Sequence, residues 1–381
     1  MSPSQINALY GTGTGQLGLS MMRLRIAPAI WNTSTKTADS SQWTAELNNG
    51  KAAQALGATI FASPWTPPAS MKSNNSVNTG SLNAGSYGDY ANYLQAYVNY
   101  ATSMGVNLYA ISMQNEPDWD PCQGGGPTAA GCYESCLWTA AQMDNWIANN
   151  ASVLTVPLIM PESLGFIHSM SDTALNDPNA VGKIGIVGGH LYGTTPQPYP
   201  LATSLGKELW MTEHAVDLAG GKSATSQSIT DAINAAEEVH NSLVTAQFNA
   251  YIYWWMTNWS GGGFYSGLLD ENNNPTFFGY AIGQYAKFVR PGYYRYMATP
   301  SPTTGVYVSA YSGNGHHVIV AINANTSANS ISFSMQNATV TSMTPYHTTS
   351  SGGLAARSAV SVSNGNFTYS LPAQSITTFV Q

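Results

Sequence analysis

Residues 106–117 have the sequence Val-Asn-Leu-Tyr-Ala-Ile-Ser-Met-Gln-Asn-Glu-Pro, and the organisation of the chain follows from this stretch. It starts after Gly105 as an apolar, β-prone run between segments with helical periodicity, a pattern typical of a buried parallel strand. Pro117 cannot donate to a sheet ladder and disfavours helix at Glu116, so the strand must end there. Because barrel enzymes carry their chemistry at the C-terminal ends of the strands, Glu116 is a candidate catalytic carboxylate.

A second apolar run, residues 208–213, also ends on a glutamate, Glu213. Two strands that each stop on a glutamate predict a carboxylate pair at one edge of the sheet, and glycoside hydrolysis is the best-known use of such a pair. Residues 157–162 form another strand that ends on an acid. We interpret this third carboxylate, Glu162, as a supporting group, and a catalytic role for it stays open.

Composition excludes several classes of protein. Of the 381 residues, 43% are hydrophobic and only 8% charged, which argues against disorder and is common in secreted proteins that meet neutral polymers. A net charge of -7 and a pI of about 5.4 give no basic surface for nucleic acid. No apolar run approaches 18 residues, so no membrane span is predicted. A signal peptide is not apparent, as expected of a mature secreted protein.

Three cysteines, Cys122, Cys132 and Cys136, follow Glu116 in a glycine-rich loop. The secreted character predicts one disulfide with one thiol left over, although the sequence does not select the pair and three free thiols are the alternative. A zinc site is not expected, because a fourth ligand is missing and no histidine lies at ligand spacing. We predict neither a metal nor a cofactor.

Strands and helices alternate along the first three quarters of the chain, which predicts a parallel sheet or barrel. We count seven strands before residue 260, one fewer than a complete (β/α)8 barrel contains. They end near Ile26, Ser63, Glu116, Glu162, Tyr192, Glu213 and Met256. After Arg290-Pro291-Gly292 the pattern changes to short alternating strands separated by turns, typical of a β-sandwich. We therefore predict a catalytic barrel over residues 1–290 and a β-sandwich over residues 291–381.

Other polar and aromatic side chains fall at predicted strand ends. The first strand, residues 20–26, carries two arginines, and we expect at least one to face a carboxylate near the site; solvated arginines on an edge strand are the alternative. His190 and Tyr192 could form hydrogen bonds with Glu213 or with the sugar, or could have a purely structural role. Trp65 and Trp254 could form a sugar platform, or simply pack in the core.

Several of these motifs together resemble glycoside hydrolase family 30, and most closely its subfamily 8, the bacterial glucuronoxylan endoxylanases. The resemblance covers nearly the whole chain. The matching segments are Leu108–Ser112 with Gln114–Pro117, Phe61–Trp65, His190–Gly193, Leu209–Glu213, Lys287–Gly292 and Leu371–Ser375. It implies a (β/α)8 barrel with a side-associated β-sandwich and retaining cleavage of β-1,4-xylan. In this family pattern Glu116 is the acid/base and Glu213 the nucleophile. Residues around the scissile bond would be Trp65, Asn115, His190, Tyr192 and Trp254. We predict Trp259 as a further substrate-binding residue.

The sequence departs from the family pattern in two places. Family members begin with sandwich strands and a glycine-rich first barrel strand, whereas this sequence starts after that point, in agreement with the count of seven. Glucuronoxylan-specific relatives carry an arginine after the last barrel strand that grips the glucuronate carboxylate. Here residues 256–263 read Met-Thr-Asn-Trp-Ser-Gly-Gly-Gly, without a cation, and the nearest downstream arginine is Arg290.

We therefore expect a secreted, monomeric, retaining endo-β-1,4-xylanase that binds xylan without strict need for glucuronic acid branches. Within the same family, the alternatives are a glucuronoxylan-dependent endoxylanase and a xylobiose-releasing or other β-glycan hydrolase. An inactive carbohydrate-binding barrel is the alternative from another class, and the intact carboxylate pair argues against it. No nucleic acid or membrane partner is expected.

Overall fold

The computed structural model describes residues 1–221 and 223–381 and divides into two compact units. One unit comprises Met21–His214 and Ala246–Ile252. The other comprises Met1–Ser20, Ala215–Thr245 and Tyr253–Gln381. The first contains nearly all of the parallel sheet, and the second contains the antiparallel sheets of the C-terminal region.

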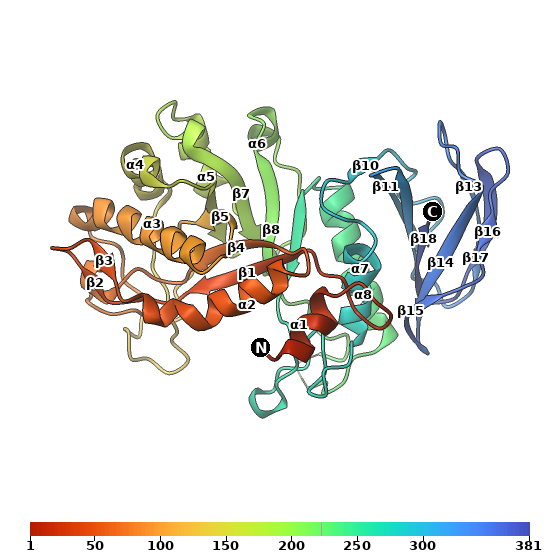
Figure 1. Ribbon diagram of the computed structural model, residues 1–381, viewed down its shortest axis with the longest axis horizontal. Helices are drawn as coiled ribbons and strands as arrows, with labels where there is room; N and C mark the ends of the chain where they lie inside the picture. Colours follow the sequence, from red (N-terminus) through yellow and green to blue (C-terminus); the bar gives the residue numbers. More distant parts are fainter. Residues whose placement is uncertain (222) are drawn as a thin grey trace. The chain divides into compact units, whose positions relative to one another are not determined.

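A seven-stranded sheet organises the first unit (Figure 1). Its spatial order is β1 (Met21–Ile26), β4 (Thr59–Pro64), β5 (Leu108–Ser112), β6 (Leu158–Ser163), β7 (Ile184–His190), β8 (Glu208–His214) and β9 (Ala250–Tyr253). Neighbouring strands from β1 through β8 pair in parallel. The prediction of a (β/α) barrel with seven strands is confirmed. All of their C-terminal ends therefore meet at one rim, where Glu116 and Glu213 were predicted to lie.

Helices connect successive strands of this sheet, as parallel pairing requires. They are α2 (Thr44–Gln54), α3 (Tyr87–Ser103), α4 (Ala140–Asn150), α5 (Ser169–Asn176) and α6 (Pro200–Ser204). Short 3-10 turns lie at Ser40–Trp43, Ala69–Met71, Ala84–Ser86, Ala151–Val153 and Val181–Lys183, and a small hairpin pairs β2 (Trp31–Asn32) with β3 (Thr37–Ala38). Helix α4 begins where Thr139 and Gln142 form a capping box, which satisfies backbone N–H groups that a helix start leaves unpaired.

One buried residue from each of the strands β4 to β9 contributes to an apolar cluster. Its buried members are Phe61, Ala110, Ile159, Ile186, Trp210 and Ala250. Side chains that pack together in this way fill the interior of a parallel barrel, so the interior is a core and not a pore. The tyrosine-rich face of α3 is also core, because Tyr90, Tyr93 and Tyr97 are fully buried. Tyr93 and Tyr97 pack on the ring of Trp43, and Tyr90 packs on Trp146. Many of the abundant aromatics thus stabilise the fold and are not available to a sugar.

The second unit is built on antiparallel sheets. Its larger sheet has the order β10 (Tyr294–Tyr296), β11 (Val306–Gly313), β12 (His316–Asn323), β18 (Ser375–Val380), β14 (Ser342–Thr349) and β15 (Gly352–Ala356), with β16 (Val360–Ser361) also paired to β14. Strands β13 (Asn329–Ser334) and β17 (Asn366–Leu371) form a second sheet. Phe333, Phe367 and Phe379 join the two sheets in one core, the arrangement of a β-sandwich.

The second unit also contains helices α1 (Pro3–Tyr10), α7 (Ile229–Val244) and α8 (Phe277–Ala286), and a 3-10 turn at Ser260–Gly262. Helices α7 and α8 pack against each other and contact strands of the larger sheet. Buried Gln284 of α8, for example, donates to Oγ1 of Thr348 in β14 at 2.8 Å. The compact units therefore do not separate at residue 290, and the proposed domain limits of 1–290 and 291–381 stay a prediction.

The structure selects the disulfide that the sequence left open. Cys122 is bonded to Cys132, and Cys136 is a buried free thiol. Burial raises the pKa of Cys136 to about 12, so this thiol is unreactive in the folded protein.

We expect the unreduced, denatured protein to take up one alkyl group, on Cys136, and the reduced, denatured protein to take up three. Because burial protects Cys136, the native unreduced protein should take up none. Intact-mass measurement after iodoacetamide treatment checks this result. Three groups without reduction would mean that the disulfide does not form.

Across the part of the chain that the structure describes, no helix combines the length and apolar character needed to cross a membrane.

Candidate active site

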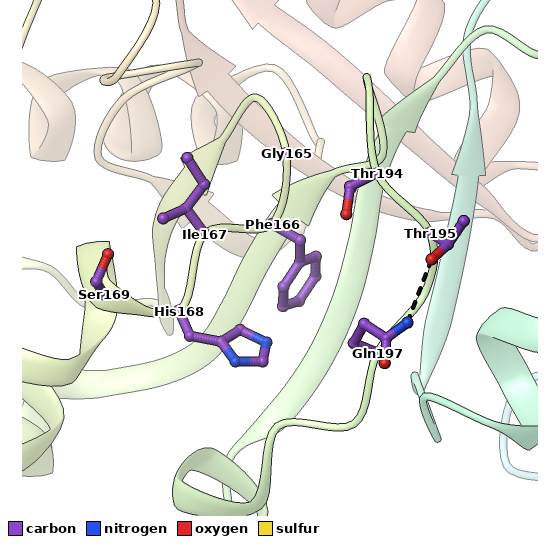
Figure 2. Close-up of a pocket in the computed structure, with 8 residues that line it drawn as sticks. All are labelled: Gly165, Phe166, Ile167, His168, Ser169, Thr194, Thr195 and Gln197. Carbon is purple, nitrogen blue, oxygen red and sulfur yellow. Dashed lines mark hydrogen bonds between the residues drawn. The ribbon is translucent and has the colours of Figure 1, made fainter.

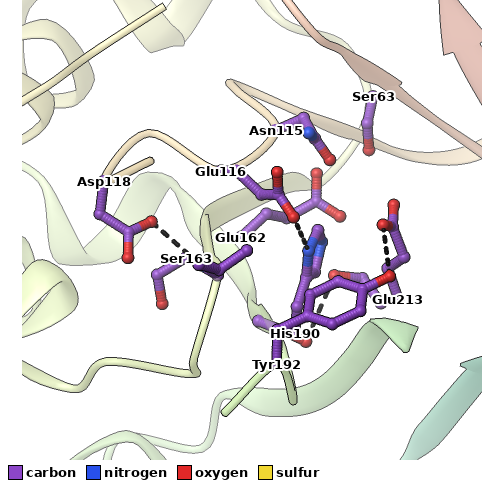
Figure 3. A network of polar contacts seen from close by, with 12 residues as sticks. Ser63, Asn115, Glu116, Asp118, Glu162, Ser163, His190, Tyr192 and Glu213 are labelled. Atoms are coloured by element: carbon purple, nitrogen blue, oxygen red, sulfur yellow. Dashed lines mark hydrogen bonds and ion pairs between the residues drawn. The ribbon is translucent and has the colours of Figure 1, made fainter. Parts of the chain in front are cut away.

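Four neighbouring strands deliver polar side chains to the same rim of the sheet. Glu116 follows β5, Glu162 lies in β6, His190 ends β7 and Glu213 lies near the end of β8. All four residues are buried, and Figure 3 shows them converging from these strands. The structure thus brings Glu116 and Glu213 to the same rim, and their catalytic roles stay predictions.

Backbone geometry after β5 fixes the direction of Glu116. This residue adopts a left-handed conformation, with φ of 45°, and its N–H donates to the carbonyl oxygen of Glu162 at 2.9 Å. The preceding Asn115 donates its N–H to the carbonyl oxygen of Pro64 at 2.8 Å. A left-handed conformation is unfavourable for a residue with a side chain, and such strain gathers at functional sites. These contacts with both neighbouring strands hold the turn in place.

Two side chains contact the carboxylate of Glu116. The Nδ1 atom of His190 lies 3.0 Å from Oε1, and the Tyr133 hydroxyl donates to Oε2 at 3.2 Å. Tyr133 was not predicted, because it lies in the irregular cysteine loop between β5 and α4, where periodicity gives no information on position. Its place directly after Cys132 was the available signal.

Arg23 of β1 connects the other groups of the site. Its guanidinium donates at 2.6 Å to Oε2 of Glu213 and at 2.6 Å to Oδ1 of Asn115. It also lies 3.3 Å from both oxygens of Glu162 and 4.7 Å from the centroid of the Trp65 ring. The expectation that an arginine of the first strand faces a carboxylate is confirmed, and Arg23 is that residue.

Glu213 receives two hydrogen bonds, one on each oxygen. Arg23 donates to Oε2. The Tyr192 hydroxyl donates to Oε1 at 3.0 Å (Figure 3). Ligand atoms of Glu116, His190 and Glu213 all lie within 4.8 Å of one another. One oxygen of each of the two glutamates therefore faces the other across a short gap.

Electrostatic coupling balances the cost of burying these charges. Burial alone would lower the pKa of Arg23, yet the charges of Glu162 and Glu213 raise it. Burial alone would raise the pKa of Glu162, and the charge of Arg23 lowers it instead. For His190, burial opposes the charged form, but the charge of Glu213 and the hydrogen bond to Glu116 raise its pKa. Arg23 and Glu162 are thus charged across the neutral pH range.

The profile of the glycosyl hydrolase family 30 TIM-barrel domain matches residues 37–261, more than half of the chain. The chain belongs to glycoside hydrolase family 30. It is 36% identical over 388 residues to the glucuronoxylanase XynC of Bacillus subtilis, covering 100% of this chain and 85% of that protein. As a member of this family, it is a glycoside hydrolase.

Solved structures of family 30 enzymes share its fold. The subfamily 8 xylanase of Clostridium acetobutylicum superposes with a TM-score of 0.88 at 41% identity, covering 100% of this chain and 92% of that one. The family 30 endoxylanase of Clostridium papyrosolvens gives a TM-score of 0.86 at 42% identity, with the same coverage. The resemblance to subfamily 8 noted from the sequence motifs is therefore confirmed.

A cation could in principle be held at the rim of this family 30 barrel. Glu116, His190 and Glu213 each offer one possible ligand atom, and these atoms lie within 4.8 Å of one another. Arg23 already supplies a positive charge to Glu213 at 2.6 Å, and it would repel a metal ion placed between these groups. The residues present therefore fit an ion-paired protein site better than a metal centre, and the prediction of no metal and no cofactor stays a prediction.

The predicted sugar contacts of the family 30 enzyme divide between the two units. Asn115, His190, Tyr192 and Trp65 lie in the unit that holds the carboxylates, and one face of Trp65 is covered by Arg23. Trp254 and Trp259 lie in the other unit, where Trp254 packs on Trp255 and the half-exposed Trp259 stacks on Phe264. All six sugar-contact assignments stay predictions.

A cavity of about 260 Å³ lies between the loops that follow β6 and β7 (Figure 2). Its walls combine two apolar side chains with polar ones, and none of them carries a carboxylate or an ammonium group. The lining residues are Gly165, Phe166, Ile167, His168, Ser169, Thr194, Thr195 and Gln197. The cavity borders the site loops, because the N–H of Tyr192 donates to the carbonyl oxygen of Leu164, next to Gly165, at 3.1 Å.

Proposed function

We propose that this family 30 enzyme is a retaining endo-β-1,4-xylanase with Glu116 as acid/base and Glu213 as nucleophile. The observation that supports this most is the separation of the two carboxylates, whose facing oxygens lie within 4.8 Å. Retaining glycosidases hold their two carboxyl groups about 5–5.5 Å apart, whereas inverting enzymes need about 6.5–9.5 Å to leave room for a water. The short gap favours direct attack by a carboxylate.

In the first step, a Glu213 oxygen attacks the anomeric carbon while protonated Glu116 gives its proton to the departing glycosidic oxygen. The bond between sugar and leaving group breaks, and a covalent ester to Glu213 forms. In the second step, ionised Glu116 takes a proton from a water, which attacks the same carbon and frees Glu213. Two inversions return the β configuration.

The contacts of each carboxylate suit these roles. Glu213 is paired with Arg23 and bonded by Tyr192, and both contacts stabilise the ionised form that a nucleophile requires. Among the described residues, no arginine forms a hydrogen bond or ion pair with Glu116, which is held instead by His190 and Tyr133, groups that also tolerate a protonated carboxyl. Pairing with an arginine on one glutamate, and hydrogen bonds to a histidine and a tyrosine on the other, give the two carboxylates the different environments that a nucleophile and an acid need.

The xylan substrate is proposed from the relatives, which are named glucuronoxylanase in Bacillus subtilis and subfamily 8 xylanase in Clostridium acetobutylicum. Independence from glucuronate is proposed from residues 256–263, which hold no lysine or arginine where a bidentate partner for a sugar carboxylate would be needed. The low content of charged residues supports secretion, because such a composition is common in secreted proteins that act on neutral polymers. The enzyme acts on this polysaccharide as a monomer and uses no cofactor in this proposal.

The experiment compares cleavage of glucuronoxylan with cleavage of unsubstituted linear xylan by the unmodified enzyme. A charge-assisted bidentate contact to the branch would be worth roughly 1.5–3 kcal/mol, which is more than tenfold in rate. Because residues 256–263 offer no such cation, we expect the rates on the two polymers to lie within about tenfold of each other. Chromatography of the products gives the pattern. Cleavage of glucuronoxylan alone, at fixed distances from each branch, would support the glucuronoxylan-dependent alternative. Cleavage of neither polymer by an enzyme active on another β-glycan would redirect the substrate assignment.

A further inference from the structure

Tyr133 occupies an unusual position for a residue of an irregular loop. It lies between β5 and α4, directly after Cys132, and its side chain is 43% exposed while its hydroxyl reaches the buried Glu116. The distance from that hydroxyl to Oε2 of Glu116 is 3.2 Å. A solvent-facing loop thus supplies a direct contact to the proposed acid/base.

The chain on both sides of Tyr133 is fixed. On one side, the Cys122–Cys132 disulfide closes a segment rich in glycine. On the other side, Glu134 forms an ion pair with Arg25 of β1. Ser135 then donates its N–H to the carbonyl oxygen of Val77 at 3.1 Å. Without these attachments, a glycine-rich segment would sample many conformations and would seldom present the hydroxyl to Glu116.

The two oxygens of Glu116 are not equivalent. His190 places Nδ1 against Oε1, and its Nε2 is buried with no hydrogen-bond partner among the described residues. A ring proton is therefore better placed on Nδ1, where it donates to Oε1. The acid proton of Glu116 is then carried by Oε2, the oxygen that Tyr133 contacts.

We propose that Tyr133 is a positioning residue that aims the proton-carrying oxygen of Glu116, and that the Cys122–Cys132 disulfide holds Tyr133 in place for this task. The inference rests on the proposed role of Glu116 as acid/base. It adds a hydrogen-bond partner and a covalent support from outside the barrel strands. Oxidation of the two cysteines is thereby linked to the acid step and not only to stability.

The pH dependence of this effect has a defined sign. The groups that face Glu116 are Tyr133, His190, Glu213, Arg23 and Asp118. Removal of the Tyr133 hydroxyl leaves the other four in place and takes away one hydrogen bond to the ionised form. The ionised form of the Glu116 carboxylate then becomes less favourable relative to the protonated form. Because the first step needs the protonated acid, the basic limb of the pH profile moves to higher pH.

The test compares Tyr133→Phe with the unmodified enzyme on two substrates, xylohexaose and dinitrophenyl β-xylobioside. General acid catalysis contributes about 10²–10⁴-fold, so a misdirected acid should lower kcat on xylohexaose roughly tenfold or more. The dinitrophenolate leaves without a proton, so glycosylation of the enzyme by the aryl substrate should slow less than twofold. The basic limb measured on xylohexaose should shift upward. Tyr109→Phe is the matched control, because Tyr109 is 44% exposed and its hydroxyl contacts Glu208 at 3.3 Å.

A Cys122→Ser/Cys132→Ser variant tests the support. It should reproduce the loss on xylohexaose and the retention on the aryl substrate, and it should add little to Tyr133→Phe because both changes act on the same contact. Equal slowing of both substrates by Tyr133→Phe, or an unmoved pH profile, would overturn the positioning role. Full activity of the cysteine variant would overturn the role of the disulfide. Glu116→Ala, measured in parallel, tests the underlying acid/base assignment separately.

Discussion

Glu213→Ala is expected to lower kcat on xylan by roughly 10⁴-fold or more, because loss of a nucleophile that acts with its partners removes most of the catalysis. A loss of this size corresponds to about 5.5 kcal/mol of transition-state stabilisation. Added azide should restore turnover of dinitrophenyl β-xylobioside, since the anion enters the space left by the carboxylate. Only one inversion then occurs, so the product should be the α-glycosyl azide, which NMR identifies.

In the same experiment, Glu116→Ala should give the opposite anomer of the glycosyl azide. Its nucleophile is intact, so azide attacks the ester to Glu213 after the first inversion, and the product should be the β-glycosyl azide. Glu208→Gln is the matched control, because Glu208 lies at the start of β8, at the far end of the strand from Glu213. We expect it to keep kcat within about threefold, as for a residue outside the site. The same azide anomer from both alanine variants would contradict the assignment of roles.

Arg23→Met is expected to lower both activity and stability. It leaves the ionised Glu162 buried without its partner, and breaking a buried pair in this way costs about 3–5 kcal/mol. It also removes one of two hydrogen bonds from Glu213 and the bond to Asn115, so kcat should fall roughly 10²–10³-fold. Urea denaturation gives the free energy of unfolding, and hydrolysis of xylan gives kcat.

Two further variants separate these effects. Glu162→Gln in the Arg23→Met background removes the unpaired charge, so it should recover part of the stability and none of the activity. Arg25→Met is the control for stability alone: Arg25 lies two residues further along β1 in a partly exposed ion pair with Glu134, and its loss should lower the free energy of unfolding by no more than about 1 kcal/mol. A fully stable Arg23→Met protein, or recovery of activity by Glu162→Gln, would contradict the role assigned to Arg23.

The pH dependence of stability follows from the same pair. The folded-state pKa of Glu162 is depressed below 4.5, because the charge of Arg23 overcomes the effect of burial. The stability from this group is therefore present above the unfolded-state pKa and lost as the pH falls through the folded-state value.

The sequence prediction of the fold and of the central carboxylates rested on hydrophobic periodicity and on the residues at the strand ends. Most of the seven strands are apolar runs bounded by turns, which is local information. The approach of Glu116 to Glu213 followed because parallel strands of one barrel end at a common rim. Arg23 was expected to find a carboxylate for a similar reason, since an arginine in a buried strand needs acceptors.

Features that depend on irregular segments were not predictable in the same way. The contact of Tyr133 with Glu116 and the choice of Cys132 over Cys136 as the disulfide partner depend on how one loop folds back on the barrel. Helices α7 and α8 have ordinary helical periodicity, which does not show that both belong to a compact unit with the C-terminal sheets. Such contacts between distant segments are decided by tertiary packing and leave no local pattern.

The anomer released first from xylohexaose tests the central claim most directly. Proton NMR recorded during the first minutes of hydrolysis, before mutarotation, distinguishes the α and β reducing ends. Two displacements at one carbon, with Glu213 as the first nucleophile, predict that the β anomer accumulates first and the α anomer follows at the rate of mutarotation. Initial accumulation of the α anomer would show single displacement by water and would contradict the retaining mechanism.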